Sequence, residues 1–480
     1  MAYPRNAPFD ADAIRLGIEY MAPKALQRPN RSTRKHSDRQ SSALEAALDT
    51  FGVVAPVPVD ADNRIIDGDA LVQAAIRLGL TEVPVVRISH LSPAQLRALR
   101  LTLNRLSELG AWDIDELRME IGEILTLDVD FPLEVMGWNT AELDVLMTPL
   151  ASADANEPEE VPPVQPVAIS QAGDVWQLGR HRLICGSSLE PEVWRILMQG
   201  RRARMAFSDP PFNCPVAGHV SGLGKKTHRE FAMASGEMSD AEFEAFLNTA
   251  LTRMAEQAED GAILSVCMDW RGLPILHAAA RAVGLSVLNL CVWNKTNGAM
   301  GSLYRSKHEL IYIFKVGKAP HINNVELGKH GRYRTNVWDY AGANSFGKGR
   351  MADLADHPTV KPTALVADAI RDVTRHGDIV IDGFIGSGST ILAAERADRI
   401  CYGVELDPLY VDVAIRRWQE ATGKEAMLEA GGLPFSAVKA ERCPEDGASV
   451  DEPDVDECDD ETVVPIAPPL SRPRPFRRAA

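Results

Sequence analysis

The chain has 480 residues, of which 45% are hydrophobic, 25% charged and 6% aromatic. This is an ordinary globular composition, and the length is sufficient for two or three domains. It excludes a collagen-like, a fully disordered and a disulfide-scaffold protein. The formal net charge of −16, from 67 acidic and 51 basic residues, argues against a nucleic-acid partner when taken as an average, because phosphate binding favours a positive surface.

The seven cysteines form no C-x-x-C pair and no cluster with histidine at zinc-ligand spacing. We therefore expect reduced, mostly buried thiols, a cytoplasmic protein and no metal site. No stretch approaches the ~18 to 20 consecutive apolar residues that a membrane helix needs, and the N-terminus has no apolar run after its basic residue. A membrane partner is therefore not expected.

Two segments of biased composition divide the chain. Residues 151–167 are rich in Pro, Ala and Glu without a hydrophobic period, which is typical of a linker. Ten of the twenty residues from 443 to 462 are acidic, none of the twenty is Lys or Arg, and prolines with four arginines follow. We therefore expect residues 427–480 to form a disordered acidic tail. Because its end carries six of the sixteen net negative charges, the body of the chain is less acidic than the average indicates.

Residues 18–150 alternate helical and strand patterns, which predicts a small α/β domain. The expected elements are a helix over 41–51, a strand over 53–59, a helix from Gly68 to Leu80, a strand over 83–88 and a helix after the N-cap Ser92. Several runs in this region resemble the N-terminal domain of the ParB partition proteins. Among them are Thr33-Arg34-Lys35-His36-Ser37, Ile65-Ile66-Asp67-Gly68, Val83-Pro84-Val85-Val86 and Leu103-Asn104-Arg105-Leu106.

One departure from that family bears on function. Its members with nucleotide chemistry carry an arginine in a G-x-x-R motif, whereas this chain has Leu71 three residues after Gly68. The guanidinium that would pair with phosphate oxygens is missing, which argues against CTP binding or nuclease activity. The resemblance still allows Arg34 and Lys35 to contact DNA. A docking or dimerisation role is equally compatible, so the module could also form a homodimer.

A short apolar strand at residues 205–207 leads into Asp209-Pro210-Pro211-Phe212. Prolines cannot continue a central strand, so Asp209 should lie at the carboxyl end of a strand, where open α/β sheets bind ligands. Its carboxylate and the Pro210 carbonyl could accept both hydrogens of an exocyclic amino group and localise the nitrogen lone pair. Phe212 could stack on a flipped base. Taken alone, an ordinary turn explains the tripeptide Asp-Pro-Pro better.

A second pattern lies nearer the C-terminus. A buried strand is expected over 378–382 and a helix over 391–397, and glycines at 383, 386 and 388 allow the backbone between them to approach a ligand closely. The next strand, over 400–404, ends at Glu405, whose carboxylate can accept both hydroxyls of a ribose. The order G-x-x-G-x-G, with Phe384 inside the loop, differs from the dinucleotide fingerprint G-x-G-x-x-G. It favours S-adenosylmethionine as the ligand.

Together these motifs resemble the amino-group DNA methyltransferases of the β arrangement, in which the catalytic segment precedes the cofactor loop. The match covers residues 171–426. It rests on the segment from Asp209 to Phe212, on Phe384, Gly386, Ser387 and Gly388, on Glu405-Leu406-Asp407-Pro408 and on His357-Pro358-Thr359-Val360-Lys361-Pro362. The resemblance implies an α/β, Rossmann-like, seven-stranded methyltransferase domain at residues 168–426, with S-adenosylmethionine as cofactor and no metal.

The resemblance also implies roles for individual residues. The catalytic site would comprise Asp209, Pro210, Pro211 and Phe212. The cofactor site would comprise Asp382, Phe384, Gly386, Ser387, Gly388, Glu405, Lys361, Pro362 and Thr363. Within it Glu405 would hold the ribose, and Lys361 would lie near the methionine carboxylate. Two positions depart from the family: Gly186-Ser187 stands where relatives have Gly-Asp, and Phe212 where tyrosine is commoner, although stacking needs only the ring.

We therefore expect a site-specific enzyme of the restriction-modification type that methylates N6 of adenine in double-stranded DNA, because Asp rather than Ser at position 209 favours adenine. A cytosine N4 methyltransferase and a non-catalytic ParB-like DNA-binding protein are the alternatives. Residues 213–236, 294–309 and 318–350 are expected to contact DNA. The last segment has six Lys or Arg against two acidic residues, although a solvated surface loop can have the same composition.

Overall fold

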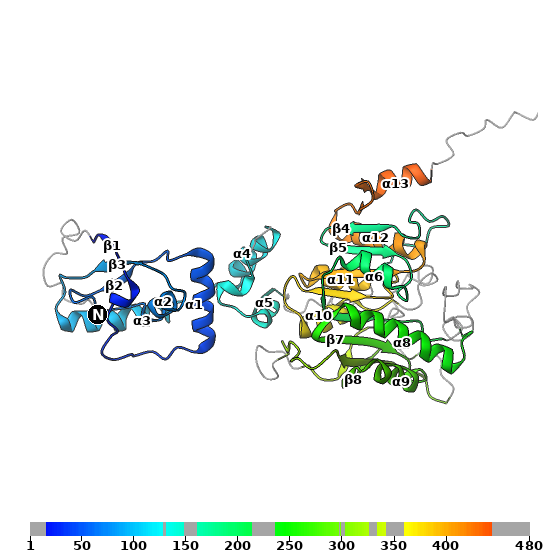
Figure 1. Cartoon of the computed structure of the whole chain (residues 1–480), viewed down its shortest axis with the longest axis horizontal. Helices are drawn as coiled ribbons and strands as arrows, with labels where there is room; N and C mark the ends of the chain where they lie inside the picture. The colour runs from blue at the N-terminus through cyan, green and yellow to red at the C-terminus, as the bar shows by residue number, and fades with distance from the viewer. Residues whose placement is uncertain are drawn as a thin grey trace, which may run out of the picture.

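The computed structural model describes residues 16–127, 131–147, 161–213, 236–296, 298, 303–325, 334–341 and 360–443. Figure 1 shows the N-terminal elements in blue, a second body in green to orange, and helices α4 and α5 drawn between them. Much of the expected DNA-contact segments 213–236 and 318–350 lies outside the described residues, as does the acidic run beyond residue 443.

The N-terminal domain is a three-stranded sheet with the order β1-β3-β2, in which β1 is antiparallel and β2 parallel to β3. Its elements are β1 (Ile18–Met21), η1 (Pro23–Ala25), α1 (Asp38–Phe51), β2 (Val57–Val59), α2 (Asp69–Arg77), β3 (Val83–Arg87) and α3 (Pro93–Ser107). Val59 and Val85 are buried in one cluster with residues of α1 and α2. The Ser92 hydroxyl accepts the Gln95 N–H in a capping box. The expected small α/β domain and its N-cap are thus confirmed.

A short helical segment follows, with α4 (Ile114–Thr126), η2 (Leu133–Met136) and α5 (Thr140–Met147). It has its own apolar cluster around Ile121, Leu133 and Leu143. Asp144 of α5 reaches the second body, where its carboxylate accepts hydrogen bonds of 2.7 and 3.1 Å from Arg399. Because both side chains are buried, the last helix of the expected domain 18–150 packs on the second body.

The second body is built on a sheet that has eleven strands within the described ranges, in the order β10-β8-β9-β7-β6-β11-β12-β5-β4-β13-β14. They are β4 (Val175–Leu178), β5 (His181–Cys185), β6 (Ala203–Ser208), β7 (Ala258–Met268), β8 (Ser286–Asn294), β9 (His308–Lys315), β10 (Val337–Asp339), β11 (Ile379–Asp382), β12 (Ile400–Glu405), β13 (Met427–Leu428) and β14 (Leu433–Pro434). The central strands β7, β6, β11, β12 and β5 run parallel, and β9 is antiparallel to both neighbours. The expected α/β class is confirmed. The expected number of seven strands is not, because short strands extend the sheet at both edges.

Helices cover both faces of this sheet. One face carries α6 (Pro191–Met198), α8 (Asp240–Gln257) and α9 (Leu273–Val283), and the other carries α10 (Thr363–Val373), α11 (Ser389–Arg396), α12 (Pro408–Thr422) and α13 (Phe435–Arg442). Val380 and Ile381 of β11 belong to opposite apolar clusters, as expected for a strand buried on both sides. In the part of the chain described here, no helix is both long and apolar enough to cross a bilayer.

The neighbouring parallel strands β6 and β11 mark the point where the course of the chain through the sheet reverses. From β6 the chain continues through α8 to β7 on one side, and from β11 through α11 to β12 on the other. Sheets of this kind bind ligands in the crevice beyond the carboxyl ends of the strands at such a switch point. Asp209 follows β6 and the loop 383–388 follows β11, so both motifs lie at this edge.

The C-terminal part differs from the expectation. Residues 427–443 are expected to be disordered, yet they form β13, β14 and α13, and β13 pairs with β4. Phe435 is buried, with its ring centroid 5.3 Å from that of Trp176. The prediction is wrong for these residues because the acidic run begins only after them. The expected tail grouped residues 427–443 with the acidic run, although α13 has an apolar side. Of the expected linker, residues 161–167 form neither helix nor strand.

Candidate active site

The site begins where β6 ends. Asp209 directly follows this strand, Pro210 is buried, and Pro211 and Phe212 are half-buried. The two prolines end the strand, because each lacks the N–H that a central strand must donate. The Asp209 side chain stays at the carboxyl edge of the sheet with 23% of its surface exposed.

An ammonium group lies against one side of this carboxylate. Lys361, just before α10, places its Nζ 2.5 Å from Oδ2 of Asp209. The rings of Phe212 and Trp293 flank the ammonium, with centroids 5.7 and 5.9 Å from Nζ. The other oxygen of Asp209, Oδ1, is buried and accepts no hydrogen bond from the described residues. Because an unpaired buried acceptor is unfavourable, this oxygen is suited to accept a hydrogen bond from a ligand.

Glu309, near the start of β9, completes a cluster of four charges. Its Oε2 lies 3.0 Å from Nζ of Lys361, and its Oε1 accepts a hydrogen bond from Lys295. Burial tends to raise the pKa of Glu309, but the two lysines outweigh it and lower this pKa to about 2. Burial raises the pKa of Asp209 in spite of Lys361. Burial tends to lower the pKa of Lys361, yet the two carboxylates keep that pKa above its ordinary value.

Three residues at this cluster are not among the catalytic and cofactor residues that the motifs assign. Trp293 is assigned no role by the sequence, whereas Lys295 and Glu309 lie in the segment 294–309, which is expected to contact DNA. In the structure Nζ of Lys295 lies 4.5 Å from the centroid of the Trp293 ring, and Trp293 is the β8 partner of Glu309. Only their position along the chain could have indicated that these three residues lie near Asp209, because β8 ends and β9 begins at the edge of the sheet where Asp209 lies.

The glycine-rich loop is tied to the end of β12. Glu405 accepts the N–H of Gly386 at 2.8 Å and that of Asp407 at 2.9 Å. Burial raises the pKa of Glu405 to about 7, although these two N–H groups lower it. Gly388 has φ +86°, and a Cβ there would lie 2.9 Å from Cβ of Ala414. The turn therefore requires glycine at position 388, both for its backbone and for the close approach of α12.

Asp382 connects this loop to the catalytic strand. Its carboxylate is buried and accepts hydrogen bonds from the Phe384 N–H at 3.0 Å, the Thr390 hydroxyl at 2.7 Å and the Ser208 hydroxyl at 3.2 Å. Burial raises the pKa of Asp382 to about 6. Both oxygens serve donors of the protein, so Asp382 braces the loop. The Phe384 ring packs against Phe246 of α8, with centroids 5.8 Å apart.

A buried arginine joins the remaining parts of the expected cofactor site. Arg417 of α12 donates to the Ser387 carbonyl at 3.2 Å, to the Ser389 hydroxyl at 3.0 Å and to the Thr363 hydroxyl at 3.5 Å. Pro362 caps the same end of α10. The loop residues and the segment 361–363, far apart in sequence, are thus brought together, although Lys361 itself pairs with Asp209.

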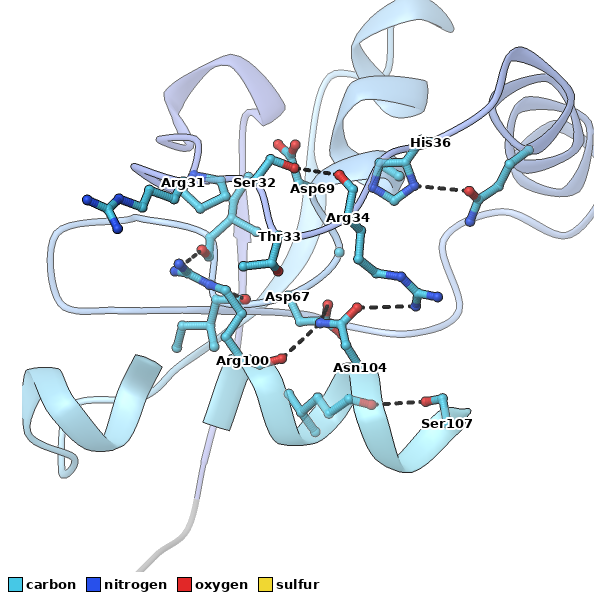
Figure 2. A pocket seen from close by; sticks show the side chains of 17 residues that line it. Arg31, Ser32, Thr33, Arg34, His36, Asp67, Asp69, Arg100, Asn104 and Ser107 are labelled. Carbon is cyan, nitrogen blue, oxygen red and sulfur yellow. Dashed lines mark hydrogen bonds between the residues drawn. The ribbon is translucent and has the colours of Figure 1, made fainter. Parts of the chain in front are cut away.

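A pocket in the N-terminal domain has a volume of about 220 Å³ (Figure 2). It is lined by residues of three ParB-like runs, including Thr33, Arg34, Asp67, Gly68 and Asn104. Arg34 donates to Asn104 at 3.3 Å, and Asn104 donates to Asp67 at the same distance. Asp69, at the start of α2, pairs with Arg28 at 2.8 Å. The lining also includes Arg31 and Arg100, so positive and negative side chains meet at this pocket, and the argument against CTP rests on the missing G-x-x-R arginine.

A doubly wound α/β sheet with a glycine-rich loop and an acidic residue at its switch point defines the class of Rossmann-like nucleotide-cofactor proteins. Residues 203–416 match the DNA methylase family model, N6_N4_Mtase. Over these residues the chain is similar to the N6/N4 family of DNA methylases, which agrees with what the motifs imply.

The chain is also similar to individual known proteins. The Type II methyltransferase M2.MboI of Moraxella bovis is 24% identical over 229 residues, which are 45% of this chain and 81% of that protein. The crystal structure of the M1.HpyAVI–SAM complex is 19% identical with a TM-score of 0.37, covering 49% of this chain and 97% of that one. A likeness to the C-terminally truncated partitioning protein ParB of Caulobacter crescentus, complexed with CTP-gamma-S, has 20% identity and a TM-score of 0.24. It covers 27% of this chain and 77% of that chain.

Proposed function

We propose that this chain transfers a methyl group from S-adenosylmethionine to N6 of adenine in double-stranded DNA. The observation that carries the proposal is Oδ1 of Asp209, a buried carboxylate oxygen to which no described residue donates. An exocyclic amino group supplies the donor that this oxygen lacks. Phe212 follows two residues later in the chain and offers a flat face for a base turned out of the double helix.

The loop after β11 fits S-adenosylmethionine, which supplies a methyl group on a sulfonium sulfur when bound. A Cβ on Gly386 would meet no atom within 4 Å, so there is open space beside the loop. Each oxygen of Glu405 accepts one backbone N–H and keeps a lone pair for a ribose hydroxyl. We assign the ribose to Glu405. The rest of the cofactor site is assigned to Phe384, Gly386, Ser387, Gly388, Pro362 and Thr363.

In the proposed reaction the residues of this chain act by positioning. Oδ1 of Asp209 and the Pro210 carbonyl accept the two hydrogens of the amino group, which favours a pyramidal nitrogen with a localised lone pair. The Asp209 carboxylate also stabilises the positive charge that develops on this nitrogen as it gains the methyl group, and the nitrogen then releases one proton to solvent to give the neutral methylated base. Lys361 holds the other carboxylate oxygen, so the side chain cannot rotate away from the base. Pro211 fixes the backbone between these groups and Phe212.

Adenine N6 and cytosine N4 are both exocyclic amino groups, and the matched family includes both activities by name. Aspartate at position 209, in the family that the motifs resemble, favours adenine, so cytosine N4 is the second candidate. We further propose a cytoplasmic enzyme whose ParB-like domain helps to engage DNA. A purely non-catalytic DNA-binding role is disfavoured by the intact acceptor at Asp209 and by the braced glycine loop.

The test uses the full chain, S-adenosylmethionine with an isotope-labelled methyl group, and genomic DNA that lacks methylated bases. Digestion to nucleosides and mass spectrometry should yield labelled N6-methyladenine. Asp209→Ala should abolish it, because the amino group loses its acceptor. Glu259→Gln, which removes a carboxylate paired with Arg204 at the opposite edge of the sheet, should leave it unchanged. Labelled N4-methylcytosine would refute the choice of adenine, and DNA binding without any labelled base would refute the enzymatic proposal.

A further inference from the structure

We infer that Glu309 is a positioning residue for the methyl transfer: it holds the Lys361 ammonium on Oδ2 of Asp209 and thereby leaves Oδ1 free for the amino group of the base. The inference rests on the proposed function and deepens it. Glu309 does not touch the base in this arrangement. It acts through Lys361.

The geometry of the cluster supports a bridge. Nζ of Lys361 lies 2.5 Å from Asp209 and 3.0 Å from Glu309, so one ammonium contacts two carboxylates that are positioned by different strands. Glu309 is on β9 and Asp209 follows β6, and β7 lies between these strands in the sheet. Lys295 contacts the other oxygen of Glu309. Glu309 is therefore fixed from one side while it holds Lys361 from the other.

The second carboxylate decides which oxygen of Asp209 the ammonium contacts. An ammonium group is a compact charge with three N–H donors, and against Asp209 alone it would be attracted equally to both oxygens. Glu309 draws it towards β9. Nζ then contacts Oδ2, and Oδ1 keeps no donor among the described residues. A residue that the motifs do not include thus controls the atom on which the proposed chemistry depends.

The same cluster controls the charge of Asp209. The titratable and charged groups that face this carboxyl are Lys361 before α10, Glu309 on β9, Lys295 after β8, Cys267 on β7 and Asp382 on β11. Burial raises the pKa of Asp209, the positive charge of Lys361 lowers it, and the negative charge of Glu309 raises it. Removal of Glu309 and removal of Lys361 should therefore shift this pKa in opposite directions.

Three variants of the full chain test the inference through kcat between acidic and alkaline pH. Glu309→Gln keeps the size but removes the charge, so kcat should fall roughly tenfold to hundredfold, the range expected for a misplaced catalytic group. The acid limb of its pH profile, which reports ionisation of Asp209, should move to lower pH. In Lys361→Met the acid limb should move to higher pH. Glu309→Asp keeps the charge but shortens the reach, so kcat should fall without a shift of the limb.

Glu259→Gln is the matched control and should keep the wild-type kcat and profile. A wild-type kcat and acid limb in Glu309→Gln would overturn the inference. So would a lower kcat with an unmoved limb in that variant, since this is the signature of a purely structural residue. If Glu309→Gln does not fold, a wild-type kcat in Glu309→Asp would overturn the inference instead. Failure of the proposed function is separate, because wild type and Glu259→Gln would then both leave DNA unmethylated.

Discussion

Asp144→Leu is expected to lower the free energy of unfolding of the second body by about 3–5 kcal/mol, the usual effect of breaking a buried ion pair. The Arg399 side chain has 0% of its surface exposed and that of Asp144 has 3%. Without Asp144, the guanidinium keeps hydrogen bonds to the Thr374 hydroxyl at 3.1 Å and the Thr374 carbonyl at 2.8 Å. It has then lost the carboxylate that balanced its charge in the interior.

Urea unfolding followed by tryptophan fluorescence is the assay, because this body contains the fully buried Trp176, Trp194 and Trp418. The double variant Asp144→Leu/Arg399→Met should recover most of the loss, since an apolar pair of similar volume replaces a buried ion pair at little cost. The Thr374 carbonyl would still accept the Asn324 amide at 2.6 Å. A loss below about 1 kcal/mol in the single variant, typical of an exposed pair, would refute the reasoning. A double variant no more stable than the single one would refute it as well.

Three further predictions concern the loop and the amino edge of the sheet. Gly388→Ala should lower the free energy of unfolding by about 1–3 kcal/mol and should weaken cofactor binding measured by calorimetry. Gly386→Ala should lower the free energy of unfolding less, because its Cβ meets open space. Burial raises the pKa of Glu405 to about 7 and ionised acceptors bind more strongly, so affinity for S-adenosylmethionine should rise from about pH 6 to about pH 8. This rise should be absent in Glu405→Gln. Burial tends to lower the pKa of His376, but two neighbouring aspartates outweigh this effect and raise that pKa. Protonated His376 should therefore stabilise the fold below its unfolded-state pKa, and this contribution should be lost as pH rises through the raised folded-state pKa. If the urea midpoint of His376→Gln had the same pH dependence as that of the wild type, this prediction would be contradicted.

Much of the fold and the outline of the site could be predicted because, at some positions, the backbone conformation requires a particular residue type. Pro210 cannot continue a central strand, and Gly388 adopts a positive φ against Ala414. Such requirements act locally, so they are visible in a sequence. Asp209 and Glu405 could be placed for a related reason, since each ends an apolar strand of a parallel sheet.

The pairing of side chains could not be predicted in the same way. Lys361 and Asp209 are 152 positions apart, and the motif alone assigns the lysine to the methionine carboxylate. Glu309 meets them only because β9 runs antiparallel between β7 and β8. These contacts depend on the tertiary arrangement of strand ends, which no local pattern in the chain encodes.

Because α5 packs on the second body, the Pro- and Glu-rich linker does not mark the point at which the chain divides into two separable parts. Asp144 anchors the chain before this linker on the second body, and after it the Ile169 N–H donates to Asp412 of the same body at 2.6 Å. A protease that cuts between these anchors would therefore not release two independent halves, because the fragments would stay associated through the buried pair. A shortened methyltransferase should therefore begin ahead of α4, so that α5 keeps its buried contact with the second body.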